Sequence, residues 1–181
     1  MLRSFPRCLR NYTTPFLAAA LAALALTAGA AQSTPELRAS DDPAVWAETE
    51  VPPPPAFSTS QLINIDLGPN VALKFGLDPK SVSIGKDDVV RYVVVATSPG
   101  ATTGLYEGIR CATGEVKTYG RYNDGQWNLA KSPEWSRLFG NGAYRHSLAL
   151  ARMGACEQTS PPRSAQDMVR NIKYPRAEST H

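Results

Sequence analysis

The stretch VVRYVVVATSPGATTGLYEGIRC, residues 89–111, decides the fold of this chain. Residues 89–97 are the run richest in β-branched side chains, which favour a pleated strand. The tripeptide Ser-Pro-Gly at 98–100 breaks this strand, and residues 103–111 return as a second one. Residues 115–122 supply a third strand after another short turn. The pattern therefore predicts an antiparallel meander.

Shorter elements surround the meander. Short strands are expected before it, at 62–67, 71–77 and 81–84. Helices are expected toward the C-terminus, at 132–138, 144–153 and 164–172. The predicted fold class is α+β: an antiparallel β-meander sheet packed by two or three C-terminal helices, with one disulfide. This organisation places a single domain at 62–173 and a flexible tail at 174–181.

The N-terminus has the order of a secretory signal peptide. Basic residues precede an apolar run at 16–26, which is followed by the small residues Ala28, Gly29, Ala30 and Ala31. The apolar run is shorter than the about 20 residues of a membrane-spanning helix, so cleavage is favoured over anchoring. Residues 1–31 are therefore predicted to be removed, after Ala30 or Ala31, and the mature chain is expected in the periplasm without a stable membrane anchor.

Residues 32–61 form an extended, proline-rich segment that leads into the domain. The run Pro52-Pro53-Pro54-Pro55 favours a stiff polyproline II conformation. Two interpretations are open: a docking site for a protein partner, or a spacer whose Trp46 and Phe57 pack onto the domain. The spacer is the favoured interpretation.

The charge of the chain argues against nucleic acid as a partner. The predicted signal peptide holds three of the 19 basic residues and none of the 16 acidic ones, so the mature chain has 16 of each. A protein without a basic excess lacks the usual attraction to the phosphate backbone.

Two cysteines, Cys111 and Cys156, remain once Cys8 leaves with the signal peptide. An even pair in an exported chain is most simply a disulfide. The rival interpretation is a metal or redox pair, but the chain has no CxxC spacing and no histidine near either cysteine in sequence. We therefore expect a disulfide, no metal site and no cofactor.

Two charged residues of the predicted hairpin lie on apolar strand faces. Alternation places Arg91 with Val93 and Val95, and it places Glu107 with Leu105 and Ile109. If the hairpin closes around Gly100, Glu107 is diagonal to Arg91 and within reach of it. A structural ion pair is the favoured interpretation, and a pocket for a carboxylate or phosphate ligand is the alternative.

Aromatic residues add a second possible binding surface. Arg110 shares a face with Tyr106, and an exposed basic and aromatic strip could also include Tyr92, Tyr119, Tyr122 and Trp127. The candidate ligand-binding residues from the sequence are Arg91, Glu107, Arg110, Tyr92 and Tyr106.

Catalytic motifs are missing from the sequence. It contains no nucleophile elbow, HExxH, P-loop or GxGxxG, and its two histidines, His146 and His181, are not placed for nucleophilic catalysis. The leading hypothesis is a non-enzymatic binding or envelope-associated module whose partner is an envelope protein or a small ligand. The alternative is a small periplasmic hydrolase that acts on envelope polymer through carboxylates such as Asp87, Asp88 and Glu107.

Several segments together carry a family resemblance. They are VSIG at 82–85, DVVRY at 88–92, YEGIRC at 106–111, Lys117 with Tyr119, Asp124-Gly125 with Trp127, and Cys156. Over residues 45–172 the chain resembles the cryptic neisserial protein-like family, a group of uncharacterised, mostly exported domains of Gram-negative bacteria. The resemblance implies a single periplasmic domain, and it brings no catalytic residue with it.

Overall fold

The computed structural model describes residues 45–69 and 71–175. The predicted signal peptide with its cleavage site, the first part of the proline-rich segment and residues 176–181 of the predicted tail lie outside the described residues.

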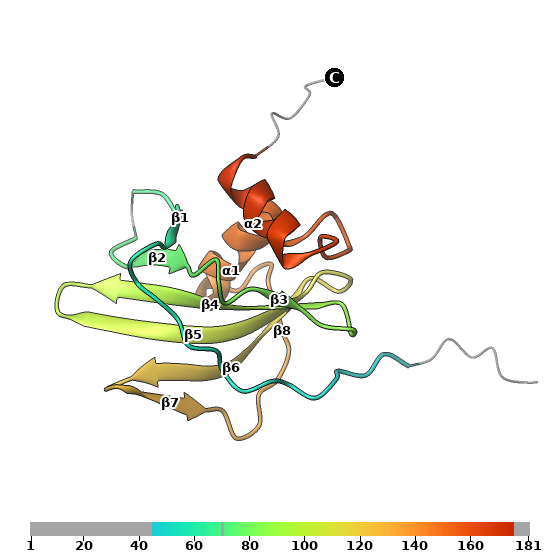
Figure 1. The fold of residues 1–181 in the computed structure, drawn as a ribbon, viewed down its shortest axis with the longest axis horizontal. Coiled ribbons are helices and arrows are strands. Elements are labelled where there is room, and N and C mark those ends of the chain that lie inside the picture. Colours follow the sequence, from blue (N-terminus) through green and yellow to red (C-terminus); the bar gives the residue numbers. More distant parts are fainter. Residues whose placement is uncertain (1–44, 70, 176–181) are drawn as a thin grey trace, which may run out of the picture. The chain divides into compact units, whose positions relative to one another are not determined.

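An eight-stranded antiparallel sheet forms the centre of the fold (Figure 1). Six strands follow the order β1-β2-β4-β5-β6-β7, while β3 pairs with β4 and β8 pairs with β6. The strands are β1 (Ile63–Ile65), β2 (Lys74–Leu77), β3 (Ser83–Ile84), β4 (Val89–Ser98), β5 (Ala101–Arg110), β6 (Glu115–Asn123), β7 (Gln126–Leu129) and β8 (Ser136–Arg137). Strands β4, β5 and β6 are neighbours in sequence and in space, which confirms the predicted meander.

The β4–β5 hairpin has a two-residue turn at Pro99 and Gly100. Ser98 pairs with Ala101, and the register continues without a shift to Val89 and Arg110. Gly100 has φ +85°, a left-handed conformation that glycine adopts without a Cβ clash. This turn determines which residues of the two strands share a face, because a slip of one residue would move every side chain to the opposite face.

Helices cover one face of the sheet (Figure 1). Helix α1 (Arg145–Leu150) continues into a π-helical turn (Ala151–Ala155), and α2 (Ala165–Lys173) follows. Leu150 and Met168 of the helical layer are fully buried in the same core cluster as Ile109 of the sheet, and each such side chain contributes about 1.5–3 kcal/mol by burial. The helices predicted at 144–153 and 164–172 are confirmed. No helix in the described ranges is long and apolar enough to cross a membrane.

The helix predicted at 132–138 is wrong. The chain there is irregular and then forms the short strand β8, in which Ser136 pairs with Val116 and Arg137 pairs with Glu115 of β6. The Ser-Pro-Glu sequence resembles a helix start, but a short helix needs an apolar face that packs. Trp135 instead packs edge-on against Trp46, with ring centroids 5.9 Å apart, and tertiary contacts therefore override the local signal.

The predicted disulfide is confirmed. Cys111, just after β5, is bonded to Cys156, just after the π-helical turn, with a Cα–Cα distance of 5.6 Å. The bond ties the helical layer to the edge of the central hairpin.

Residues 45–58, which we call the strap, cross the sheet face opposite the helices (Figure 1, cyan to teal). Phe57 packs edge-on against Tyr122 and Trp127, with centroid distances of 5.1 and 5.8 Å. Trp46 donates a hydrogen bond from Nε1 to the carbonyl oxygen of Asp87 at 3.0 Å. Trp46 and Phe57 therefore pack onto the domain, as the spacer interpretation required.

Candidate functional site

Glu107 is a carboxylate in the centre of the sheet, on the face that the helices cover. In the strand register Glu107 lies opposite Tyr92 of β4 and Thr118 of β6, and 1% of Glu107 is exposed to solvent. A buried charge of this kind is costly unless hydrogen-bonding groups surround it. Its partners therefore decide what it can do.

Four side chains donate hydrogen bonds to the Glu107 carboxylate. His146 Nε2 lies 3.2 Å from Oε1 and 3.1 Å from Oε2, and Ser147 Oγ lies 2.9 Å from Oε2. Tyr92 OH donates to Oε2 and Thr118 Oγ1 donates to Oε1, both at 3.3 Å. Burial by itself raises the pKa of Glu107, but the hydrogen bond and charge of His146, with the hydroxyl donors, bring that pKa below its usual range. Glu107 is therefore held as a carboxylate.

Helix α1 delivers two of these donors as neighbours in sequence. His146 and Ser147 are both buried in its first turn, and His146 stacks flat on Phe75 of β2, with ring centroids 4.6 Å apart and planes 2° apart. The stacking fixes the imidazole ring, and the helix position fixes the Ser147 hydroxyl. Because Ser147 donates to Glu107, the three residues do not form a serine–histidine–acid relay.

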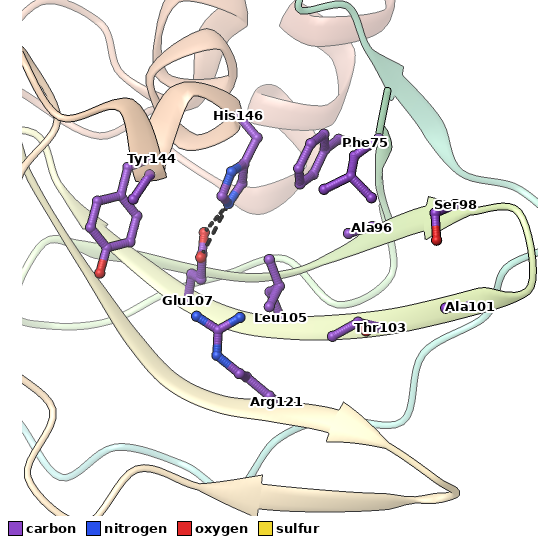
Figure 2. A pocket seen from close by; sticks show the side chains of 12 residues that line it. Phe75, Ala96, Ser98, Ala101, Thr103, Leu105, Glu107, Arg121, Tyr144 and His146 are labelled. Carbon is purple, nitrogen blue, oxygen red and sulfur yellow. Dashed lines mark hydrogen bonds and ion pairs between the residues drawn. The ribbon is translucent and has the colours of Figure 1, made fainter. Parts of the chain in front are cut away.

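A pocket of about 310 Å³ opens beside this cluster (Figure 2). Apolar residues form one part of its wall: Leu73 precedes β2, and Phe75, Ala96, Ala101 and Leu105 lie on the strands, where Ser98 and Thr103 add hydroxyl groups. Glu107 and His146 line one end, and Tyr144 closes one side. The small side chains of Ala96 and Ala101 leave the hollow unfilled. An apolar pocket with a few convergent polar groups is the usual form of a small-molecule site.

Arg121 is the one arginine that lines this pocket. It lies on β6 opposite Leu105, is exposed, and none of the described residues makes an ion pair or a hydrogen bond with its guanidinium. Figure 2 shows the guanidinium turned toward the side of the pocket that holds Glu107 and Leu105. The pocket therefore combines an apolar wall, a saturated carboxylate and a cation that is free for a ligand.

The predicted Arg91–Glu107 ion pair is wrong, because the two side chains point to opposite faces of the sheet. Arg91 pairs with Gly108, whereas Glu107 pairs with Tyr92. Arg91 therefore lies under the strap and Glu107 lies under the helices.

Arg91 takes its counter-ions from two other segments. Its Nη1 donates to Asp87 Oδ1 at 3.1 Å, and its Nη2 donates to Asp87 Oδ2 at 2.7 Å and to Glu48 Oε1 at 3.4 Å. Glu48 of the strap also binds Lys117 Nζ and Tyr119 OH, each at 2.5 Å. Asp87 is thus buried rather than solvated in its turn, and this second polar cluster fastens the strap to the sheet.

The exposed basic and aromatic strip, which the sequence left open as one possibility, is not formed, because most of its aromatic residues lie in the core. Tyr92 faces the helices with no exposed surface, and Tyr106 and Tyr119 are covered by the strap. Arg110 lies with its guanidinium carbon 3.6 Å from the Trp46 ring centroid and forms an ion pair with Glu115 at 3.8 Å. Of the five candidate ligand-binding residues, the structure brings Tyr92 and Glu107 together, and it places Arg91, Arg110 and Tyr106 on the other face.

Comparison with known protein families agrees with the family resemblance of the sequence. The model of the CNP1-like family matches residues 41–173, a range that includes the strap, the whole sheet and both helices. The chain belongs to the CNP1-like family. No curated protein and no solved structure matches the chain significantly. The proteins of the CNP1-like family are uncharacterised, so membership assigns no activity to the pocket.

Sequence reasoning missed several residues of this CNP1-like domain. Glu48, His146, Ser147 and Arg121 were not among the candidates, although a charge on an apolar strand face always requires a partner. That requirement, applied to Glu107, would have pointed to His146 as one of only two histidines. Nothing in the sequence marks Arg121. Among the described residues no group of three or more potential metal ligands is present.

Proposed function

We propose that this chain is an exported periplasmic binding module that takes a small ligand in the pocket beside Glu107 and His146. The observation that carries the proposal is the pocket itself, an apolar hollow of about 310 Å³ with charged groups at one end. Its volume lies at the lower end of the about 300–1,000 Å³ that small-molecule sites occupy. The ligand is accordingly small.

The state of the carboxylates favours binding over hydrolysis. A hydrolase that works through carboxylates needs one acid that exchanges a proton with substrate and a second group that attacks or activates water. Both oxygens of Glu107 are occupied by donors from the protein, and Asp87 is tied to Arg91 and Thr49. These two carboxylates therefore serve the fold, while Asp88 is exposed in its turn.

The disulfide supports export, because such bonds persist in oxidising compartments such as the periplasm. The signal-peptide pattern of residues 1–31 supports the same compartment.

Pocket-filling tests the proposal. Protein purified from the periplasm is titrated with hexanoate, 1-hexanol and hexylammonium while the amide NMR signals of Leu105, Glu107 and His146 are followed. At least one probe should shift these signals saturably at millimolar concentration, the affinity expected of so small a contact. In the Ala96→Phe variant the ring fills the hollow, so the shifts should disappear.

Thr97→Phe is the matched control, because Thr97 is exposed on the opposite face of β4. This variant should bind like the unmodified protein. Absence of saturable shifts with every probe, or undiminished binding by Ala96→Phe, would refute the binding function. The intact mass of the same preparation should begin at Ala31 or Gln32, and an uncut N-terminus would refute export by the predicted signal.

A further inference from the structure

We infer that the ligand is a small monocarboxylate with a short apolar tail, bound with its carboxylate at Arg121 and its tail against Phe75 and Leu105. This inference rests on the proposed function and names the chemical class of the ligand. It follows from the distribution of charge and apolar surface in the pocket.

The apolar part of the pocket favours a ligand with a hydrocarbon tail. Phe75 and Leu105 face the hollow from neighbouring parts of the sheet, and Ala96 leaves space between them (Figure 2). Phe75 is held by its flat stacking on His146, so this wall is preorganised. Burying hydrocarbon against such a wall is favourable, and a preformed wall adds little ordering cost.

The polar part of the pocket favours a ligand with a negatively charged head group. The Arg121 guanidinium presents donors in a planar fork that matches a carboxylate, and no described residue occupies them. Its exposure places the bound carboxylate at the solvent side of the pocket, where the ligand keeps part of its hydration. The tail then extends inward along Leu105, the cross-strand neighbour of Arg121.

Glu107 determines that the ligand has one carboxylate and not two. Its carboxylate lies at one end of the pocket and takes donors from His146, Ser147, Tyr92 and Thr118. A second negative group placed beside it would meet like charge. A cationic head would meet the like charge of Arg121, and the oxygens of Glu107 are already occupied by donors, so the head would regain little of its lost hydration.

The probe set of the pocket test separates the head groups, because hexanoate, 1-hexanol and hexylammonium share one tail. Hexanoate should bind most tightly. Arg121→Gln should weaken hexanoate binding roughly twofold to fivefold, the range for an exposed charged contact, and should leave 1-hexanol unchanged. Arg121→Lys should restore part of the affinity, and added salt should weaken hexanoate alone.

Arg137→Gln is the matched control, since Arg137 is also an exposed strand arginine and does not line this pocket. It should not change any of the three affinities. Thermal unfolding of each variant checks that the fold is intact.

The outcomes distinguish the inference from the proposed function. Tightest binding by hexylammonium or 1-hexanol, or hexanoate binding that Arg121→Gln leaves unchanged, overturns the inference while the pocket remains a binding site. Failure of all three probes overturns both.

Discussion

Replacing Asp87 with asparagine should leave Arg91 as a buried cation without its main counter-ion. The Arg91 side chain is 2% exposed and the Asp87 side chain has no exposed surface. Asp87 also accepts hydrogen bonds from the backbone N–H and the hydroxyl of Thr49, at 2.9 and 2.8 Å, so it joins the strap to the β3–β4 turn. Asparagine keeps the size of the side chain but loses the charge and one acceptor oxygen.

The expected loss follows from what remains around Arg91. After the substitution the nearest carboxylate is Glu48, whose Oε1 lies 3.4 Å from Nη2 and which also serves Lys117 and Tyr119. Breaking a buried ion pair by removing one partner costs about 3–5 kcal/mol. Since asparagine retains one acceptor, we expect a loss near the lower value, about 3 kcal/mol, which corresponds to a fall in Tm of about 10–15 °C for a domain of this size.

Urea unfolding followed by tryptophan fluorescence measures this loss directly, because Trp46 donates its indole N–H to the Asp87 carbonyl oxygen. Asp88→Asn is the matched control, with the same chemical change one residue further along. Asp88 is exposed and has φ +59°, a conformation that asparagine tolerates well, so this variant should lose less than about 0.5 kcal/mol.

A double variant identifies the physical cause. Arg91→Met removes the charge that Asp87→Asn leaves uncompensated, so the combined variant should be more stable than the sum of the two single losses predicts. The reasoning is refuted if Asp87→Asn loses no more than Asp88→Asn, or if the two losses at positions 87 and 91 simply add.

Two further predictions concern acid and the disulfide. Burial raises the pKa of Asp87, but the hydrogen bonds from Arg91, Thr49 and Val89 together bring it below its usual range. Burial likewise raises the pKa of Glu107, and its hydrogen-bond donors, with His146 the largest contributor, together lower it. The contribution of these two carboxylates to stability is therefore complete above the ordinary pKa of about 4 and is lost as pH falls below it. Tm should decrease steadily below about pH 5, and it should decrease less steeply in Asp87→Asn. An equal pH dependence of Tm in both proteins would contradict the role assigned to Asp87. Cys156→Ser opens a loop with a sequence separation of 45 residues and should lower the free energy of unfolding by up to about 4 kcal/mol. Reduction of the unmodified protein should have the same effect. An unchanged urea midpoint would show that the disulfide adds little stability.

Elements with a strong local cause were predictable from the sequence. The β-branched run at 89–97 became β4, because those side chains pack well on a pleated surface buried on both faces. The helix predicted from residue 164 begins at Ala165, and Ser164 caps it by accepting a hydrogen bond from the Asp167 N–H at 3.1 Å. The predicted helix at 132–138 had a start signal but no apolar face to pack, and residues 136–137 instead pair with β6 as the short strand β8.

The pairing of charges depended on register. Alternation correctly placed Arg91 and Glu107 relative to the neighbours in their own strands. It does not determine which residues of two paired strands share one face of the sheet. The two-residue turn pairs Ser98 with Ala101, and therefore Arg91 with Gly108. This register separated two residues whose opposite charges and nearness in the hairpin had suggested an ion pair.

The sequence by itself determined the antiparallel meander, the two helices, the disulfide partners and the family, because each depends on local pattern or on a small set of alternatives. Only the tertiary structure decided that His146 lies against the Glu107 carboxylate, that Glu48 and Asp87 pair with Arg91, and that Arg121 is left open at a pocket. The physical reason is that a buried charge requires a partner, but the sequence does not say which residue that partner is. The partner is determined by the strand register, the path of the strap and the position of α1.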